Sequence, residues 1–153
     1  QLDIPNNEAK AYITAYFDKY PGIKNYMERT ISQAREKGYV TTLFGRKCHI
    51  TGINDRNPNI RGFAERADIN APIQGGAADI IKRAMIRMGN ALRIEGVSAQ
   101  MLLQVHDELI FEVAEEEADK TISVVQETME TAAHLDVPLV VDVRMGMSWD
   151  EAH

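Results

Sequence analysis

The stretch LLQVHDELIFEV, residues 102–113, decides the fold and raises the question of function. Two short apolar runs flank His106, Asp107 and Glu108, and this pattern predicts two β-strands joined by a tight turn. The strands would hold two carboxylates and an imidazole rigidly at the tip, and carboxylate oxygens are the preferred ligands of Mg²⁺. Asp also favours turns for conformational reasons, so the stretch by itself leaves both a metal site and simple turn chemistry open.

The composition is that of one ordinary globular domain. The chain has 153 residues, 44% of them hydrophobic and 26% charged, and no apolar run approaches the roughly 18 residues of a membrane span. Its one cysteine, Cys48, excludes a disulfide framework and a cysteine-rich zinc site, and favours the reducing cytoplasm. The N-terminus begins without Met and has no basic segment followed by an apolar one. We therefore expect a piece of a longer chain, without a signal peptide.

Charge is distributed unevenly along the chain. Residues 1–66 hold 11 Lys and Arg against 7 Asp and Glu, whereas residues 96–153 hold 2 against 13. The net charge of −6 argues mildly against a nucleic-acid partner, but the basic N-terminal part fits a surface that meets phosphates. Two ordinary solvated surfaces would give the same asymmetry.

The order of the expected elements predicts an α+β fold. An N-terminal helix should be capped by Asn6 or Asn7 and broken by YPG at 20–22. The further elements are a helix at 23–37 ended by Gly38, a hairpin at 39–50, a loop at 51–59, helices at 60–71 and 74–96 separated at Pro72, the hairpin at 102–113, a helix at 114–135 and a closing strand at 137–146. They predict an antiparallel sheet with helices packed on one side.

The motifs taken together are far more specific than any one of them. QVHDELIFEV at 104–113 resembles the C-terminal catalytic motif of the family A DNA polymerases, the bacterial DNA polymerase I family. The resemblance extends, in order, through YFDKYPGIKNYMERT (16–30), GYVTTLFGRK (38–47), FAERADINAPIQGGAADIIKRAM (63–85), DVPLVVDV (136–143) and WDEAH (149–153). It covers essentially the whole chain. It implies the last part of the fingers at about residues 1–70, and a palm-type sheet with its helices at about 71–153.

The resemblance also implies roles for residues of the hairpin. Asp107 would be one of the two metal-binding aspartates of a two-Mg²⁺ site, with Glu108 beside it as a supporting catalytic carboxylate. His106 would lie near the primer terminus, and Gln104 on the strand leading to the tip, both as DNA-binding residues. The implied activity is template-dependent addition of deoxynucleotides to a primer 3′-OH, in DNA replication and repair.

Arg66, Asn70 and Gln74 match family positions that contact the primer–template. They are four residues apart, so on a continuous helix they would line one face. Their side chains can hydrogen-bond minor-groove acceptors, which every correct base pair presents in similar places. The alternative is that Arg66 and Asn70 only make local caps or ion pairs around Pro72.

Two features depart from the family pattern. The family usually reads QGTAAD where this chain reads QGGAAD, so Gly76 should lower helix propensity by up to about 1 kcal/mol and remove a hydroxyl that could cap the helix. We expect a small stability cost, which Gly76→Thr would reverse. The family's other metal-binding aspartate, in a DYSQIE-like motif, and its triphosphate-binding helix do not occur in these 153 residues. One protein ligand of the Mg²⁺ site would therefore come from outside the chain.

The sequence thus predicts a C-terminal piece of a bacterial DNA polymerase, cytoplasmic and associated with the nucleoid. Its expected partners are primer–template DNA, deoxynucleoside triphosphates and the remainder of its own polymerase chain, with no membrane. Three alternatives stay open: a non-catalytic duplex-binding fragment that is inactive without the missing motifs, a two-metal nuclease, and a structural acidic domain. The nuclease would need further clustered carboxylates.

Overall fold

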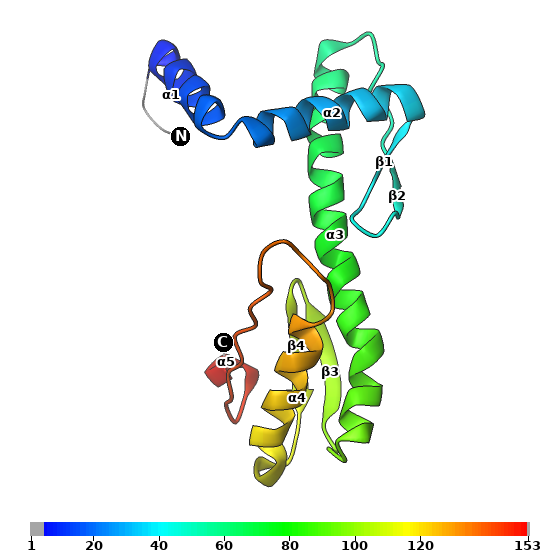
Figure 1. Ribbon diagram of the computed structural model, residues 1–153, viewed down its shortest axis with the longest axis vertical. Coiled ribbons are helices and arrows are strands. Elements are labelled where there is room, and N and C mark those ends of the chain that lie inside the picture. Colours follow the sequence, from blue (N-terminus) through cyan, green and yellow to red (C-terminus); the bar gives the residue numbers. More distant parts are fainter. Residues whose placement is uncertain (1–4, 153) are drawn as a thin grey trace. The chain divides into compact units, whose positions relative to one another are not determined.

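The computed structural model describes residues 5–152 (Figure 1). Its elements are α1 (Asn6–Lys19), α2 (Pro21–Lys37), β1 (Tyr39–Thr41), β2 (Lys47–His49), α3 (Pro58–Ile94), β3 (Gln100–Val105), β4 (Glu108–Glu112), the 3₁₀ helix η1 (Glu115–Glu117), α4 (Ala118–Glu130) and α5 (Trp149–Ala152). Helices combined with two two-stranded antiparallel sheets confirm the α+β prediction. None of the described helices is long and apolar enough to cross a membrane.

The chain divides into two compact units, Gln1–Gly75 and Gly76–His153. The division falls inside α3, near the boundary at about residue 70 that the sequence predicts. The assignment of the two parts to fingers and palm stays a prediction. Each unit has its own hydrophobic core.

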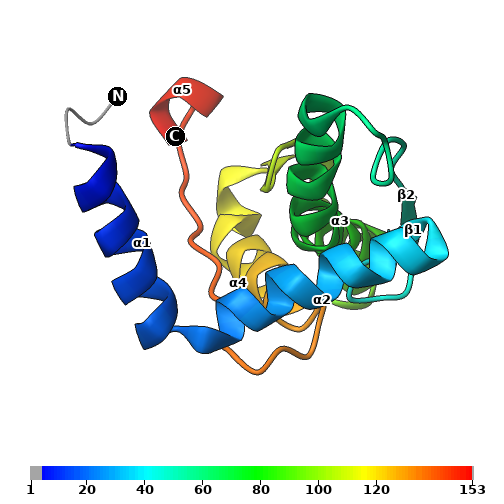
Figure 2. The same cartoon turned by 90° about the horizontal axis from the view of Figure 1, so that it is seen from above.

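The core of the first unit lies between α2, the first hairpin and the N-terminal part of α3. Its buried side chains are Ala34, Val40, Ile53 and Ala64. Two polar contacts join α2 to α3: the Tyr26 hydroxyl donates to the Ile69 carbonyl at 2.9 Å, and Arg35 forms an ion pair with Glu65 at 2.6 Å. In both views α2 crosses α3 (Figures 1 and 2). The part of α3 that carries Arg66 and Asn70 is therefore held firmly by its neighbour.

Proline and glycine set the helix boundaries of this unit. Helix α2 ends at Gly38, whose φ of +75° is the left-handed conformation predicted for it, and the YPG break is confirmed. The predicted asparagine cap of α1 is wrong, because Asn6 is already helical and Pro5 precedes it without a side-chain cap. Pro5 has the extended backbone that suits a residue before a helix, and its carbonyl accepts the Ala9 N–H at 3.0 Å.

Gly75 allows the first hairpin to lie directly against α3. A Cβ added there would lie 2.7 Å from Thr42 Cγ2 and 3.1 Å from Arg46 Nη2. The Arg46 guanidinium also donates to the Gly75 carbonyl at 2.9 Å. A side chain at this position would therefore push the hairpin away from the helix.

Gly75→Ala is expected to lower the free energy of unfolding by about 1–3 kcal/mol, because overpacking outweighs the gain in helix propensity. Gly89→Ala is the matched control, since Gly89 lies in the same helix and its added Cβ would meet nothing within 4 Å. The control is expected to raise stability by up to about 1 kcal/mol. Urea unfolding of both variants measures the difference, and shifts of the same sign and size would contradict the packing argument.

Helix α3 runs without interruption from Pro58 to Ile94, so the predicted break at Pro72 is wrong. Proline removes one N–H donor, and in a helix interior this costs about 3 kcal/mol. Fully buried residues on either side, Ala64 and Met88, show that tertiary packing holds the helix and overrides local propensity. The capping argument for Gly76 is wrong as well, because Gly76 lies inside this helix and not at its start. Its propensity cost stays a prediction.

Asp68 is a buried carboxyl in α3 that the sequence analysis missed. Its exposed fraction is 1%, and neither carboxylate oxygen has a hydrogen-bond partner among the described residues. It lies on the helix face of Ala64 and Ala71, which pack in the core of the first unit. Burial away from water disfavours the charged form and raises the pKa of the Asp68 carboxyl above its ordinary value of 3.8.

Stability is therefore expected to fall as the pH rises through the raised pKa of Asp68. Below 3.8 the carboxyl is protonated in both the folded and the unfolded protein, so it adds no pH dependence there. At higher pH the unfolded state ionises first, and ionisation favours unfolding. Asp68→Asn should raise the free energy of unfolding at neutral pH and leave acid stability nearly unchanged. Urea unfolding at several pH values checks this, and an equal gain at every pH would rule out charge as the cause.

The second unit is built on the β3–β4 hairpin, with helices covering one side. Its core joins α3, α4 and the hairpin through Met88, Leu92, Val97, Val124 and Val125, with Leu109 and Phe111 packed against them. Arg83 and Arg87 of α3 donate to the carbonyls of Ala132 and Thr131 at 3.2 and 2.8 Å. These carbonyls follow the C-terminal end of α4, where the helix dipole favours cations. The hairpin is thus supported by two helices that are fastened to each other (Figure 1).

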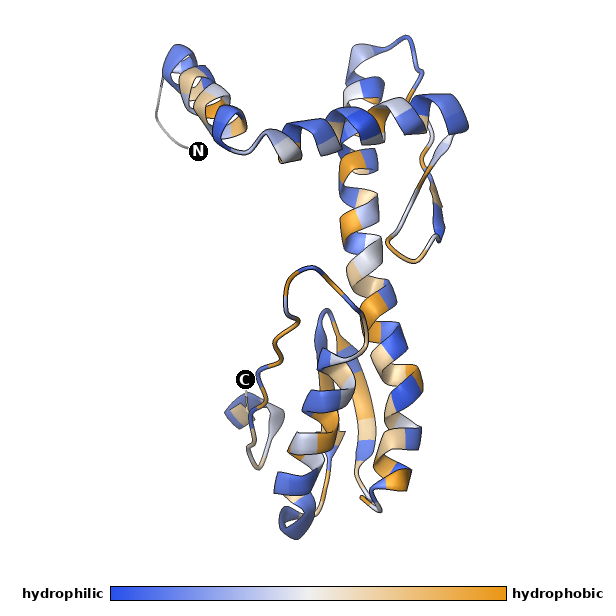
Figure 3. Cartoon of the chain, in the orientation of Figure 1, coloured by the Kyte–Doolittle hydropathy of each residue, from blue (hydrophilic) through white to orange (hydrophobic). Residues whose placement is uncertain are grey.

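The predicted closing strand at 137–146 is wrong. These residues form no strand, and α4 ends at Glu130 instead of near residue 135. A strand needs a ladder partner, and within residues 5–152 β3 pairs with β4 alone. The backbone of Val141 is hydrogen-bonded to side chains of α4 instead. Glu130 accepts its N–H at 3.1 Å, and Gln126 donates to its carbonyl at 3.3 Å. Val137 and Val140 of this segment stay exposed, and Figure 3 shows hydrophobic residues along its ribbon.

Candidate active site and nucleic-acid interface

The predicted hairpin tip is a two-residue turn. Strands β3 and β4 pair antiparallel up to Val105 and Glu108, which leaves His106 and Asp107 as the turn. The side chains of His106, Asp107 and Glu108 are all exposed. The prediction of a hairpin that displays these three residues at its tip is therefore confirmed.

The backbone of the turn is strained at His106. Its φ of +52° makes it the one non-glycine residue of the described chain with a positive φ. The favoured two-residue hairpin turns, types I′ and II′, have a positive φ at their first central residue, and a side chain there costs about 1 kcal/mol or more. Gln104 Nε2 donates to the His106 carbonyl at 2.5 Å and so braces the turn. Strain that is maintained at an exposed acidic tip suggests a functional role.

A β-bulge in β3 is a second feature that the sequence analysis missed. The pairing register shifts between Met101 and Leu103, so Leu102 has no partner across the hairpin. A bulge increases the local twist and re-aims the side chains that follow it. Leu102 and Leu103 are both about half exposed, where strict alternation would bury one of them. The orientation of Gln104 and of the tip depends on this bulge.

The carboxylates of the tip fit part of a metal site. Asp107 and Glu108 are adjacent and exposed. Within residues 5–152, no group of three or more His, Cys, Asp or Glu side chains is arranged to hold a metal ion. Mg²⁺ is usually held by one or two carboxylates together with waters and substrate phosphates. The carboxylates of the tip therefore suit some of the ligands of a Mg²⁺ site, whose further ligands would come from elsewhere.

The three polar residues predicted to contact DNA share one face of α3. Arg66, Asn70 and Gln74 are exposed and line a shallow depression of about 490 Å³ in the first unit. The depression is completed by Ile50, Phe63, Ala67 and Ala71. Because α3 continues through Pro72, the predicted spacing along one helix face is confirmed.

Local roles for Arg66 and Asn70 are not observed. Pro72 lies inside α3 and creates no helix end that these side chains could cap. In the described part of the chain, neither side chain makes a hydrogen bond or an ion pair. Their donors are therefore available to an external acceptor. This face belongs to the first unit, whereas the hairpin tip belongs to the second.

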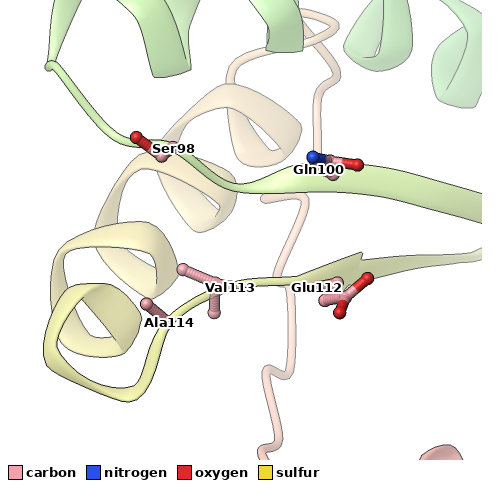
Figure 4. Close-up of a pocket in the computed structure, with 5 residues that line it drawn as sticks. All are labelled: Ser98, Gln100, Glu112, Val113 and Ala114. Atoms are coloured by element: carbon pink, nitrogen blue, oxygen red, sulfur yellow. The ribbon is translucent and has the colours of Figure 1, made fainter.

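Another depression, of about 300 Å³, lies at the open end of the β3–β4 hairpin (Figure 4). Its lining residues are Ser98, Gln100, Glu112, Val113 and Ala114. Gln100 and Glu112 form the register pair at the opposite end of the hairpin from Asp107. With one carboxylate and no cationic or aromatic side chain, this lining offers neither a metal-ligand set nor a surface for nucleic acid.

Each unit thus carries a candidate site: hydrogen-bond donors on one face of α3 in the first, and carboxylates at the hairpin tip in the second. The profile of DNA polymerase family A matches residues 1–151, and the chain belongs to this family. It is 54% identical over 151 residues to DNA polymerase I of Streptococcus pneumoniae, an alignment that covers 99% of this chain and 17% of the relative. It is 50% identical over 153 residues to DNA polymerase I of Pseudomonas aeruginosa, covering 100% of this chain and 17% of the relative.

The structure resembles a solved polymerase domain closely. The POL domain of Pol1 from M. smegmatis, in complex with DNA primer–template and dNTP, matches with a TM-score of 0.94 and 47% sequence identity. The match covers 99% of this chain and 27% of that one. The chain thus spans a minor part of the length of the relatives that it matches.

Proposed function

We propose that the protein containing this chain is a DNA-directed DNA polymerase, which extends a primer 3′-OH on a DNA template in replication and repair. The rigid, strained and exposed acidic tip at Asp107 carries this proposal. The names of the bacterial relatives and the DNA and dNTP in the similar polymerase domain support it. The same proposal locates the enzyme in the bacterial cytoplasm, at the nucleoid, where its DNA substrate lies.

Asp107 is the proposed metal ligand of this chain. Bound Mg²⁺ would activate the attacking 3′-oxygen and stabilise the charge on the leaving oxygen. Asp107 holds its carboxylate at a fixed point because the paired strands β3 and β4 end on either side of it. Glu108 adds a second negative charge beside it, and His106 contacts the primer terminus. One protein ligand comes from a part of the polymerase outside this chain.

The polar face of α3 is the proposed contact with the minor groove of the primer–template. Arg66, Asn70 and Gln74 follow one another at about 6 Å along the helix, close to the rise of two base steps. They would reach purine N3 and pyrimidine O2, which occupy similar positions in all correct pairs. Gln104 would also meet the DNA, through the second N–H of its amide nitrogen, because the first donates to the His106 carbonyl. These polar side chains would test the shape of each base pair without distinguishing one base sequence from another.

A non-catalytic duplex-binding role is the second candidate, for the chain by itself. It is motivated by the family's other metal-binding aspartate motif, which does not occur in these 153 residues. Residues of about 1–70 would then act as a fingers-side surface and about 71–153 as an incomplete palm.

Primer extension distinguishes the two candidates. The complete polymerase should extend a primed DNA with Mg²⁺ and dNTPs, and the isolated 153-residue chain should bind the same duplex without extending it. Extension by the isolated chain would contradict the non-catalytic role. A folded complete protein that fails to extend would contradict the polymerase assignment.

A further inference from the structure

Phe63 is an exposed aromatic side chain in the depression lined by Arg66, Asn70 and Gln74, the polar row of α3. Its exposed fraction is 67%, and it lies about one helical turn before Arg66. Ile50, which follows β2, lines the depression as well and is partly buried. The small side chains of Ala67 and Ala71 leave the space between these walls open. The depression therefore has an apolar side and a hydrogen-bonding side.

The fold itself does not use the ring of Phe63. Ala64, the next residue of α3, is buried in the core of the first unit, whereas Phe63 is not one of the core residues. Exposing a phenyl ring to water is unfavourable, and burying it against a ligand would be favourable. The ligand that fits has an apolar surface next to hydrogen-bond acceptors, and the basic excess of residues 1–66 favours an anionic one. Duplex DNA has these three properties along the edge of its minor groove.

We propose that Phe63, backed by Ile50, packs against a deoxyribose of one DNA strand while the polar row bonds to the base edges beside it. This inference rests on the proposed polymerase function and adds a sugar contact to it. In RNA the 2′-hydroxyl is displayed in the minor groove, whereas the C2′ of a deoxyribose presents only C–H. A hydroxyl pressed against the ring would lose water without gaining a hydrogen bond. Phe63 therefore favours a deoxyribose at this position, whatever the base.

Binding of the complete polymerase to a DNA primer–template, by fluorescence anisotropy, tests the proposal. The variants are Phe63→Ala and Phe63→Leu, with Ile73→Ala as the matched control. Ile73 is an apolar residue of the same helix that is 60% exposed and lies outside the lining of the depression. The duplexes are all-DNA or carry a single ribonucleotide at successive positions of either strand. Primer extension on the all-DNA duplex is measured in parallel.

Phe63→Ala is expected to weaken binding to the all-DNA duplex about fivefold, as partial burial of a phenyl ring implies. Phe63→Leu keeps most of the apolar area and should weaken it by about twofold or less. Ile73→Ala should bind like the wild type. In the wild type, a ribonucleotide at one position should weaken binding severalfold, and Phe63→Ala should remove that penalty at the same position.

Equal binding of the all-DNA duplex by the wild type and Phe63→Ala would overturn the proposal. So would a ribonucleotide penalty that Phe63→Ala leaves unchanged at every position. Because Phe63 is exposed, the variants should keep the wild-type melting temperature. If alanine perturbs the helix, binding by Phe63→Leu still measures the contribution of the ring. Either negative result with normal extension leaves the polymerase assignment intact, whereas a wild-type protein unable to extend would contradict the proposed function instead.

Discussion

Asp107→Ala in the complete polymerase is expected to reduce primer extension by about a thousandfold or more, since a metal ligand supplies several kcal/mol of transition-state stabilisation. DNA binding should largely survive. The proposed duplex contacts are donors on α3, and removing a carboxylate near phosphates takes away repulsion. Single-turnover extension and equilibrium binding of the same primer–template measure the two effects separately.

Asp142→Ala is the matched control for this prediction. Asp142 is an exposed aspartate of the same unit, and its ion pair with Arg144 at 3.3 Å lies at the surface. Exposed pairs of this kind contribute little to stability, so extension should stay at the wild-type level. Asp107→Asn keeps the size of the side chain and loses only the charge, so it should fail nearly as completely as alanine. Near-normal extension by either Asp107 variant would refute the assignment of Asp107.

Arg66→Ala has the second-largest expected effect, a loss of about tenfold or more in extension efficiency, the cost of one lost bidentate or charged contact. Arg66 is exposed, makes no bond within the described residues, and heads the polar row of α3. The loss should be the same for all template sequences, because minor-groove acceptors are shared by all base pairs. The dependence of binding on salt should also become shallower, since one cation is removed.

Arg93→Ala controls for the loss of a positive charge on α3. Arg93 lies in the last turn of the same helix and donates to Asn90 at 2.8 Å. It should leave primer–template binding unchanged. Steady-state extension over a range of primer–template concentrations compares the two variants. A defect that depended on base sequence, or an equal defect in Arg93→Ala, would contradict the minor-groove assignment.

Much of the fold follows from local chemistry in the sequence. Gly38 ends α2 because a left-handed residue is needed there, and the two short apolar runs on either side of His106 and Asp107 produce the β3–β4 hairpin. The errors arise where distant contacts decide. Packing on both sides keeps α3 helical through Pro72, and Val141 bonds to α4 where no ladder partner is present within residues 5–152.

The sequence predicted which residues belong to the candidate site but not their geometry. The positions of Asp107 and of Arg66, Asn70 and Gln74 follow from motif and helical spacing. The bulge at Leu102 and the strained φ of His106 depend on how two strands pair, and no local pattern encodes either. The burial of Asp68 likewise depends on packing from other segments, which the sequence around it does not show.

Metal binding at the tip tests the central claim most directly. Mn²⁺ can replace Mg²⁺ at carboxylate sites and is visible by electron paramagnetic resonance. Titration of Mn²⁺ into the complete polymerase with primer–template and a non-reactive nucleotide should show two bound ions in the wild type. Asp107→Ala should lose one of them or bind it at least about tenfold more weakly. Two ions bound with unchanged affinity in Asp107→Ala would contradict the assignment of the hairpin tip as half of the metal site.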